Sequence, residues 1–214
     1  VVEVKLCFQS LASISTYFHS SAVRTREIKT LAKERDLVYV HLPPVFEVRW
    51  TEFSYSLLNA ILRSWFALVS YFRESSDSAA AGHLQFLTSD SNLRVMTYLA
   101  DMLFCFARFQ QRLQKDSTTV VDLQEAVANV RNTVASLKTT PLVGGWQEEF
   151  EQCVTESNGD RYLRGIKLNT SLRRREKHHL FVSDKRDSKA ICNEVSDSLA
   201  EFLLQRFSVD NVLI

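Results

Sequence analysis

Basic residues concentrate in one segment, residues 161–189. The segment holds ten Lys or Arg and three acids, a net charge of +7, while the whole chain carries +1, so the rest carries −6. Its densest part contains Arg173, Arg174, Arg175 and Lys177. Such cations can follow a nucleic-acid backbone, because each one that neutralises a phosphate releases condensed counterions. The alternative is a basic loop that is solvated or paired with the acidic body, and the sequence favours neither.

A second feature is the pair Arg49-Trp50, which follows Pro43-Pro44 and opens a long helical pattern. An aromatic ring beside a cation can stack on an unpaired base and hold the phosphate of that base. The alternative is a tryptophan that caps the core, with the arginine stem packed along it. The residue types alone favour this alternative.

Motifs for metal binding or catalysis are missing from the sequence. His178 and His179 are adjacent, so their side chains point in different directions, and neither has a Cys or His at zinc-ligand spacing. Gly144-Gly145 lacks the Lys-Ser/Thr of a phosphate loop, and no nucleophile elbow occurs. Asp101 lies in an apolar helical pattern, where a capping or ion-pairing role is the commoner one. We therefore expect no catalytic residue, metal or cofactor.

The composition is that of a folded, helical protein. The chain has 214 residues, of which 45% are hydrophobic, 24% charged and 11% aromatic, and this excludes a disordered tail. Only 5 Gly and 3 Pro favour long helices over many short strands. Apolar runs stay below the roughly 18 residues of a membrane span, and the four cysteines are scattered. The chain starts without Met, and we expect a piece of a soluble, intracellular protein with reduced cysteines.

Apolar spacing predicts most of the elements. Helices are expected over residues 4–18, 24–34, 50–72, 92–113, 120–137, 146–154 and 191–207, with an extended segment at 37–48 and a linker at 75–82. Asp116-Ser117 and Asp187-Ser188 are expected to cap the helices that follow them, and residues 157–160 to form a turn. These elements predict an all-α fold, a multi-helix bundle in which residues 1–214 form a single domain.

Several segments resemble hAT-superfamily DNA transposases and the vertebrate zinc-finger proteins derived from them. Residues 43–53, Pro-Pro-Val-Phe-Glu-Val-Arg-Trp-Thr-Glu-Phe, are similar to the region around the "RW" motif of these proteins. Residues 98–110, 141–146 and 199–207 resemble further landmarks in the same order, so the resemblance covers most of the chain.

The resemblance implies an all-helical domain inserted into an RNase H-like catalytic fold. In the family, two Asp and one Glu bind divalent metal, and the tryptophan of the RW motif handles DNA that flanks the cut. By position, Arg49 and Trp50 take that role here. The catalytic Asp residues are expected before Val1 and the Glu after Phe207, and Cys7-Phe-Gln-Ser10 lacks the His of the family motif that precedes RW. A non-catalytic piece is therefore implied.

Two functions of different class follow from these observations. The first is a DNA-binding helical domain of a transposon-derived nuclear protein, with contacts from Arg49, Trp50, Arg173, Arg174, Arg175 and Lys177. The second is a scaffold that holds protein partners such as chromatin or SUMO-pathway factors. The resemblance implies both, because proteins of this family adopted by host genomes include both kinds, and one relative is described as a SUMO ligase.

Overall fold

The computed structural model describes residues 2–44, 50–114, 119–170 and 187–206, with the backbone alone for 50–53 and 206. Within these ranges the chain forms nine helices and one three-stranded sheet. The helices are α1 (Val2–His19), α2 (Ala22–Glu34), α3 (Trp50–Arg63), α4 (Trp65–Glu74), α5 (Ser78–Leu87), α6 (Asp90–Leu113), α7 (Val120–Ser136), α8 (Trp146–Cys153) and α9 (Ser188–Arg206). The strands are β1 (Val154–Ser157), β2 (Asp160–Leu163) and β3 (Ile166–Lys167). The predicted all-α, multi-helix fold is confirmed, with a small sheet added.

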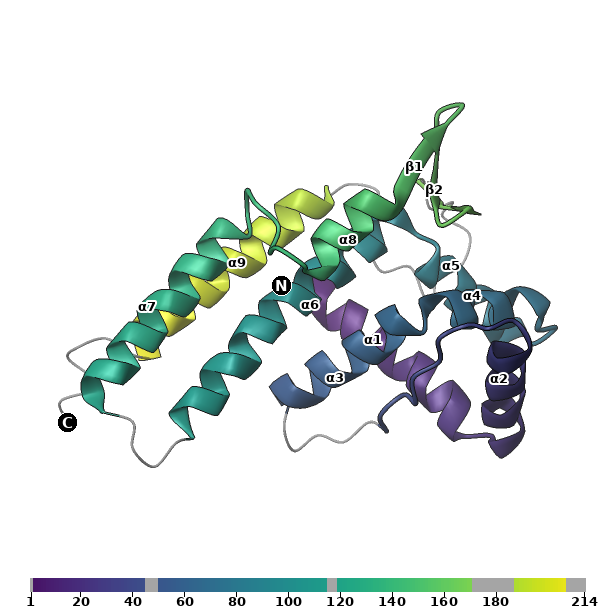
Figure 1. The fold of residues 1–214 in the computed structure, drawn as a ribbon, viewed down its shortest axis with the longest axis horizontal. Helices are drawn as coiled ribbons and strands as arrows, with labels where there is room; N and C mark the ends of the chain where they lie inside the picture. The colour runs from purple at the N-terminus through teal and green to yellow at the C-terminus, as the bar shows by residue number, and fades with distance from the viewer. Residues whose placement is uncertain (1, 45–49, 115–118, 171–186, 207–214) are drawn as a thin grey trace.

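Helix α6 is the centre of the molecule. Every residue from Val95 to Leu103 is buried, so this stretch has neighbours around its whole circumference. Its neighbours are α3, α5, α7, α8 and α9. Figure 1 shows α7 and α9 together on one side of α6 and α1 to α5 on the other. After Leu103 the only buried residue of α6 is Phe109, with Phe106 and Leu113 partly buried against the core, so one face of these last turns is open to solvent.

A buried polar chain joins α6 to the α7–α9 pair. The Tyr98 hydroxyl, on α6, hydrogen-bonds to the Ser196 hydroxyl of α9, and Ser196 in turn donates to the Val134 carbonyl of α7 at 3.4 Å. Tyr98 and Ser196 are fully buried. Because unpaired hydroxyls in a core cost stability, this chain of bonds fixes how the three helices meet.

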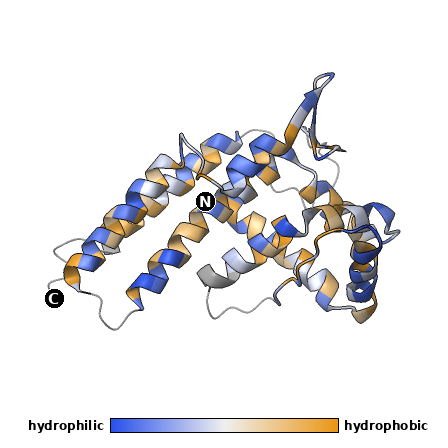
Figure 2. Ribbon diagram, viewed as in Figure 1, coloured by the Kyte–Doolittle hydropathy of each residue, from blue (hydrophilic) through white to orange (hydrophobic). Residues whose placement is uncertain are grey.

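Aromatic packing holds α1, α4 and α5 together. Tyr17 of α1 meets Phe72 of α4 and His83 of α5 edge to face, at ring distances of 5.4 and 5.3 Å. Phe18 and Tyr71 extend the cluster, with ring centres 5.3 Å apart. Helix α2 covers α4 from outside and is largely hydrophilic on the face seen in Figure 2.

One predicted helix is divided in two. Residues 50–72 were expected to form a single helix, but α3 ends at Arg63 and α4 starts at Trp65. The break lies at Ser64, whose buried hydroxyl accepts from the Val40 N–H at 2.7 Å and donates to the Val40 carbonyl at 3.3 Å. This long-range bond also anchors residues 37–44, which are neither helix nor strand.

Two further expectations need correction. The expected linker at 75–82 contains the start of α5, because Asp77 caps the helix by accepting from the Ala79 N–H at 3.0 Å and three alanines follow. The cap of α7 is Thr119, in a capping box with Asp122. Asp116-Ser117, the expected cap, lies outside the described residues. The expected cap of α9 is confirmed at Asp187, which accepts from the Lys189 N–H at 3.3 Å.

Of the small sheet, the sequence predicted only the turn at residues 157–160. Strand β1 pairs antiparallel with β2, and β2 with β3. Asn158-Gly159 joins the first pair with both φ positive, at 53° and 78°, as a two-residue hairpin turn requires. Arg164-Gly165 joins the second pair in the same way, at 49° and 81°. Asn169 then bonds to the Thr88 carbonyl at 2.8 Å, and this attaches the sheet to the start of α6.

Asp101 has the capping role that the sequence favoured. Its buried carboxylate accepts from the backbone N–H groups of Trp146 at 2.7 Å and Gln147 at 3.0 Å, the first residues of α8. Burial raises the pKa of Asp101, whereas the hydrogen bonds from these two N–H groups act to lower it. A Cβ on Gly145 would lie 2.8 Å from both carboxylate oxygens, so only glycine allows this approach. Gly144-Gly145 is therefore a turn, as expected.

Candidate nucleic-acid interface

Helix α3 runs antiparallel to α6. The Tyr55 ring, near the start of α3, lies 6.0 Å from the Phe104 ring of α6, whereas Leu62, near the end of α3, lines a cleft with Leu93 and Thr97. A helix rises 1.5 Å per residue, so the step from Tyr55 back to Trp50 spans about 7.5 Å, close to the roughly 6 Å from Phe104 to Arg108 on α6. The first residue of α3 therefore lies beside the last turns of α6.

Two arginines lie on these last turns. Arg108 and Arg112 are exposed and one helical turn apart, so they share a face of α6. The Arg108 guanidinium lies over the Phe104 ring, 5.3 Å from its centre. The stretch from Met102 to Gln114 contains no acidic residue. We call the start of α3, together with Arg108 and Arg112, the α3–α6 end.

A cleft of about 470 Å³ adjoins the α3–α6 end, between α6 and α7. Its walls combine the aromatic rings of α6 with both arginines and, on the α7 side, amide and hydroxyl groups. The lining residues used below are Phe104, Arg108, Gln111, Arg112, Asn129 and Thr133. Rings beside cations suit a ligand that carries both flat apolar surface and negative charge, as an unpaired nucleotide does.

The structure places one of the predicted contact residues. Trp50 is the first residue of α3, at the α3–α6 end. Arg49, Arg173, Arg174, Arg175 and Lys177 lie outside the described residues, as do His178 and His179. Arg108 and Arg112 were not among the predicted contact residues, although their spacing in an acid-free helical stretch is visible in the sequence.

The described cations at the start of the basic segment are paired with acids. Arg161 lies 2.6 Å from both carboxylate oxygens of Asp90, Arg164 lies 2.6 Å from Glu149, and Lys167 lies 2.5 Å from Asp160. These three residues, in the sheet or in its second turn, therefore have carboxylate partners within the molecule, and residues 171–186 of the basic segment lie outside the described residues.

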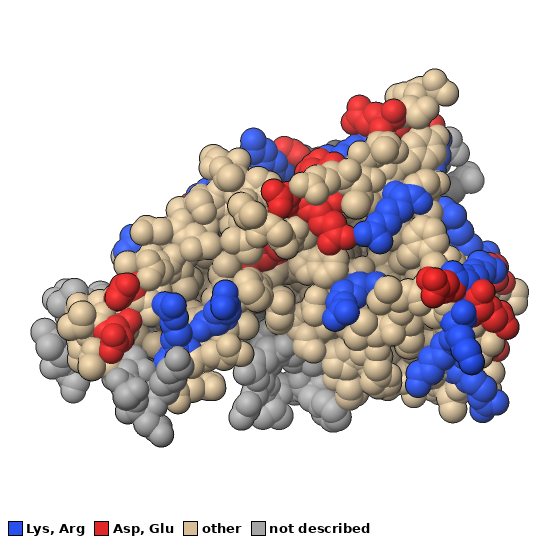
Figure 3. Space-filling view, in the orientation of Figure 1, with Lys and Arg blue, Asp and Glu red and all other residues tan. Residues whose placement is uncertain are grey.

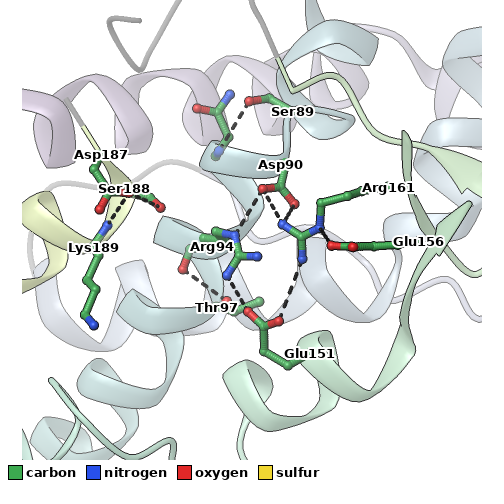
Figure 4. Close-up of polar contacts among 11 residues, drawn as sticks. Ser89, Asp90, Arg94, Thr97, Glu151, Glu156, Arg161, Asp187, Ser188 and Lys189 are labelled. Carbon is green, nitrogen blue, oxygen red and sulfur yellow. Dashed lines mark hydrogen bonds and ion pairs between the residues drawn. The ribbon is translucent and has the colours of Figure 1, made fainter. Parts of the chain in front are cut away.

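Arg161 belongs to a network in which four charges form a ring, and Glu156 lies 3.5 Å from Arg161 as a fifth charge outside the ring (Figure 4). Asp90 also bonds to Arg94 at 3.0 Å, Arg94 bonds to Glu151, and Glu151 lies 3.7 Å from Arg161. The Arg161 and Asp90 side chains are only 15% and 13% exposed, so solvent screens this pair weakly. The network connects β2 and α8 to the first turn of α6, and we assign it a structural role.

A second row of cations runs along α2. Arg26, Lys29 and Lys33 are exposed and lie on one face of the helix. Glu27 and Glu34 are on the same helix, and Figure 3 shows acidic side chains among the basic ones in this region, at the lower right. We therefore use this row as the comparison for the α3–α6 end, which lies on another part of the molecule.

Within the described ranges, no group of three or more His, Cys, Asp or Glu side chains could hold a metal ion. None of the described helices is long and apolar enough to cross a bilayer. The four cysteines are unpaired, and Cys7 and Cys192 are buried, in keeping with the expectation of reduced core thiols. Burial raises the pKa of Cys192 to about 12, so its thiol stays protonated at neutral pH.

A double-mutant cycle tests the structural role of the four-charge network. Arg161→Ala removes the closer of the two arginines that bind Asp90 and leaves Arg94 as its partner. We therefore expect a loss of about 1–2 kcal/mol in the free energy of unfolding, and a less than additive loss when Asp90→Ala is combined with it. Urea unfolding of the four proteins measures this coupling. Lys167→Ala, which breaks an exposed pair, is the control and should cost less than about 0.5 kcal/mol. Additive losses from Arg161→Ala and Asp90→Ala would contradict the assignment.

Comparison of this chain with protein-family models, with curated proteins and with solved structures finds no match.

Proposed function

We propose that this chain is a non-catalytic helical domain of a transposon-derived nuclear protein and that it contributes to DNA binding. The observation that carries the proposal is the α3–α6 end, where the helix start at Trp50 lies beside the exposed Arg108 and Arg112. Arg49, Arg173, Arg174, Arg175 and Lys177 are proposed to add phosphate contacts. The resemblance of residues 43–53 to the RW region of hAT transposases supports the same assignment.

The division of charge also supports DNA binding at this end of the molecule. Around the sheet, described arginines are neutralised by Asp90, Glu149 and Glu151. On α6 the last acid before this end is Asp101, which is buried and accepts a hydrogen bond from the start of α8, and no acid follows it up to Leu113. A phosphate backbone would meet cations without nearby surface carboxylates on α6.

A protein-binding scaffold is the second candidate, and a groove of about 410 Å³ favours it. The groove lies between α1, α6 and α9 and is almost wholly apolar, lined by Phe8, Leu99, Phe106, Leu199 and Phe202 among others. Phe202 is 52% exposed, a large value for so apolar a ring. A partner such as a chromatin or SUMO-pathway factor could cover it.

Removal of the two arginines tests the DNA-binding proposal. Arg108→Ala combined with Arg112→Ala should lower the salt dependence of DNA binding by about two counterion equivalents, because each phosphate contact contributes about one. Fluorescence anisotropy with labelled duplex over a salt series measures the slope, and circular dichroism checks the fold.

The α2 row supplies the matched control for this measurement. Lys29→Ala combined with Lys33→Ala removes the same charge from a different surface and should leave the slope near that of the unchanged chain. Equal reductions in the two double variants would mean that binding depends on overall charge alone, and the α3–α6 end would lose its role.

Trp50 should matter most where bases are unpaired. Stacking of one base on an aromatic side chain is worth about 1–3 kcal/mol, so Trp50→Ala should weaken binding to a hairpin-ended DNA by about tenfold or more. Binding to plain duplex should change much less, and Trp50→Phe should keep most of the hairpin preference. Equal losses on both DNAs, together with a lower melting temperature, would show that Trp50 is a core residue.

A further inference from the structure

A cleft of about 530 Å³ lies away from the α3–α6 end, where α3, α4, α6, α8 and β2 meet. This volume is within the range of ligand-binding clefts. The floor is apolar and aromatic, formed by Leu62, Phe66, Leu93, Trp146, Phe150 and Leu163. None of these residues belongs to the proposed DNA contacts.

One wall of the cleft is the segment after α2, where Leu37 and Val38 line the cavity. Val38 is 60% exposed. The backbone N–H and C=O groups of Val38 and Tyr39 form no hydrogen bond with any described residue, whereas those of Val40 are bound to Ser64. Of these two residues Val38 lines the cavity, and neighbouring residues of an extended chain point their backbone groups to opposite sides, so the wall offers one residue's donor and acceptor for strand addition.

The charges on the rim restrict the ligand. Arg164 and Glu149 pair with each other at 2.6 Å. Arg63 is exposed and forms no ion pair within the described part of the chain. Asp36, also exposed, lies on the same rim, so a ligand that is acidic along its whole length is disfavoured.

From these observations we infer that the cleft binds an extended peptide segment of a partner protein. The peptide lies along Val38, inserts a large apolar side chain between Phe66 and Trp146, and places one acidic residue at Arg63. Backbone pairing supplies affinity in this mode, and the cavity and Arg63 supply specificity. The site is independent of the DNA contacts proposed above, so either can fail without the other.

Selection from a random dodecapeptide phage library against the chain tests the inference. The enriched sequences should share one large apolar residue with an acid close to it, and the synthetic consensus peptide is then used for binding by anisotropy. Arg63→Glu should weaken that peptide by about tenfold or more. Arg73→Glu, an exposed charge reversal on α4 outside the cleft, should change affinity less than about twofold.

Two further readouts separate this mode from simple charge attraction. In ¹⁵N-labelled protein the peptide should shift the amide signals of Val38 and Tyr39, and N-methylation of the peptide backbone beside its apolar residue should abolish binding. No enrichment, equal binding to Arg63→Glu and Arg73→Glu, or amide shifts elsewhere would overturn the inference. Selection of peptides rich in Lys and Arg would also overturn it.

Discussion

Burial of α6 around its whole circumference is the constraint on which the rest of the structure depends. Because every residue from Val95 to Leu103 is covered, the helices that surround this stretch have fixed directions. Tyr98 binds the α9 side, and Asp101 holds the start of α8. Beyond Leu103 only one face of α6 is covered, and the open face carries the exposed Arg108 and Arg112 at the place where α3 begins.

Charge is distributed by the same architecture. The sheet lies against the first turn of α6. Its arginines form ion pairs there with carboxylates of α6 and α8, and these pairs neutralise most of the charge of the arginines. The opposite end of α6 has no acidic residue after Asp101, and Asp101 itself is turned inward to α8. A chain of net charge +1 can thus carry two exposed arginines on a stretch of α6 that holds no acidic residue.

The sequence predicts the helices well because apolar spacing reflects burial directly, as in residues 92–113. It fails where long-range bonds or short elements decide. Ser64 breaks a helix through a bond to Val40, 24 residues away, and strands of four and two residues are too short to show alternation. The candidate site shows the same contrast between features visible in local sequence and features set by long-range packing. Trp50 was proposed as a contact residue from its neighbours in sequence, whereas Arg108 was added to the candidate site only from the antiparallel packing of α3 on α6. The pairing of Arg161 with Asp90, 71 residues apart, was equally invisible.

The most direct test of the α3–α6 end as a DNA-binding surface is site-specific photo-cross-linking. A benzophenone amino acid at Gln111, exposed in the cleft beside Arg108 and Arg112, should cross-link to hairpin-ended DNA, with most adducts at the unpaired bases. The same group at Thr30, exposed among the cations of α2, should give few adducts. Equal cross-linking from both positions, or none from position 111 while the chain is bound to DNA, would contradict the account.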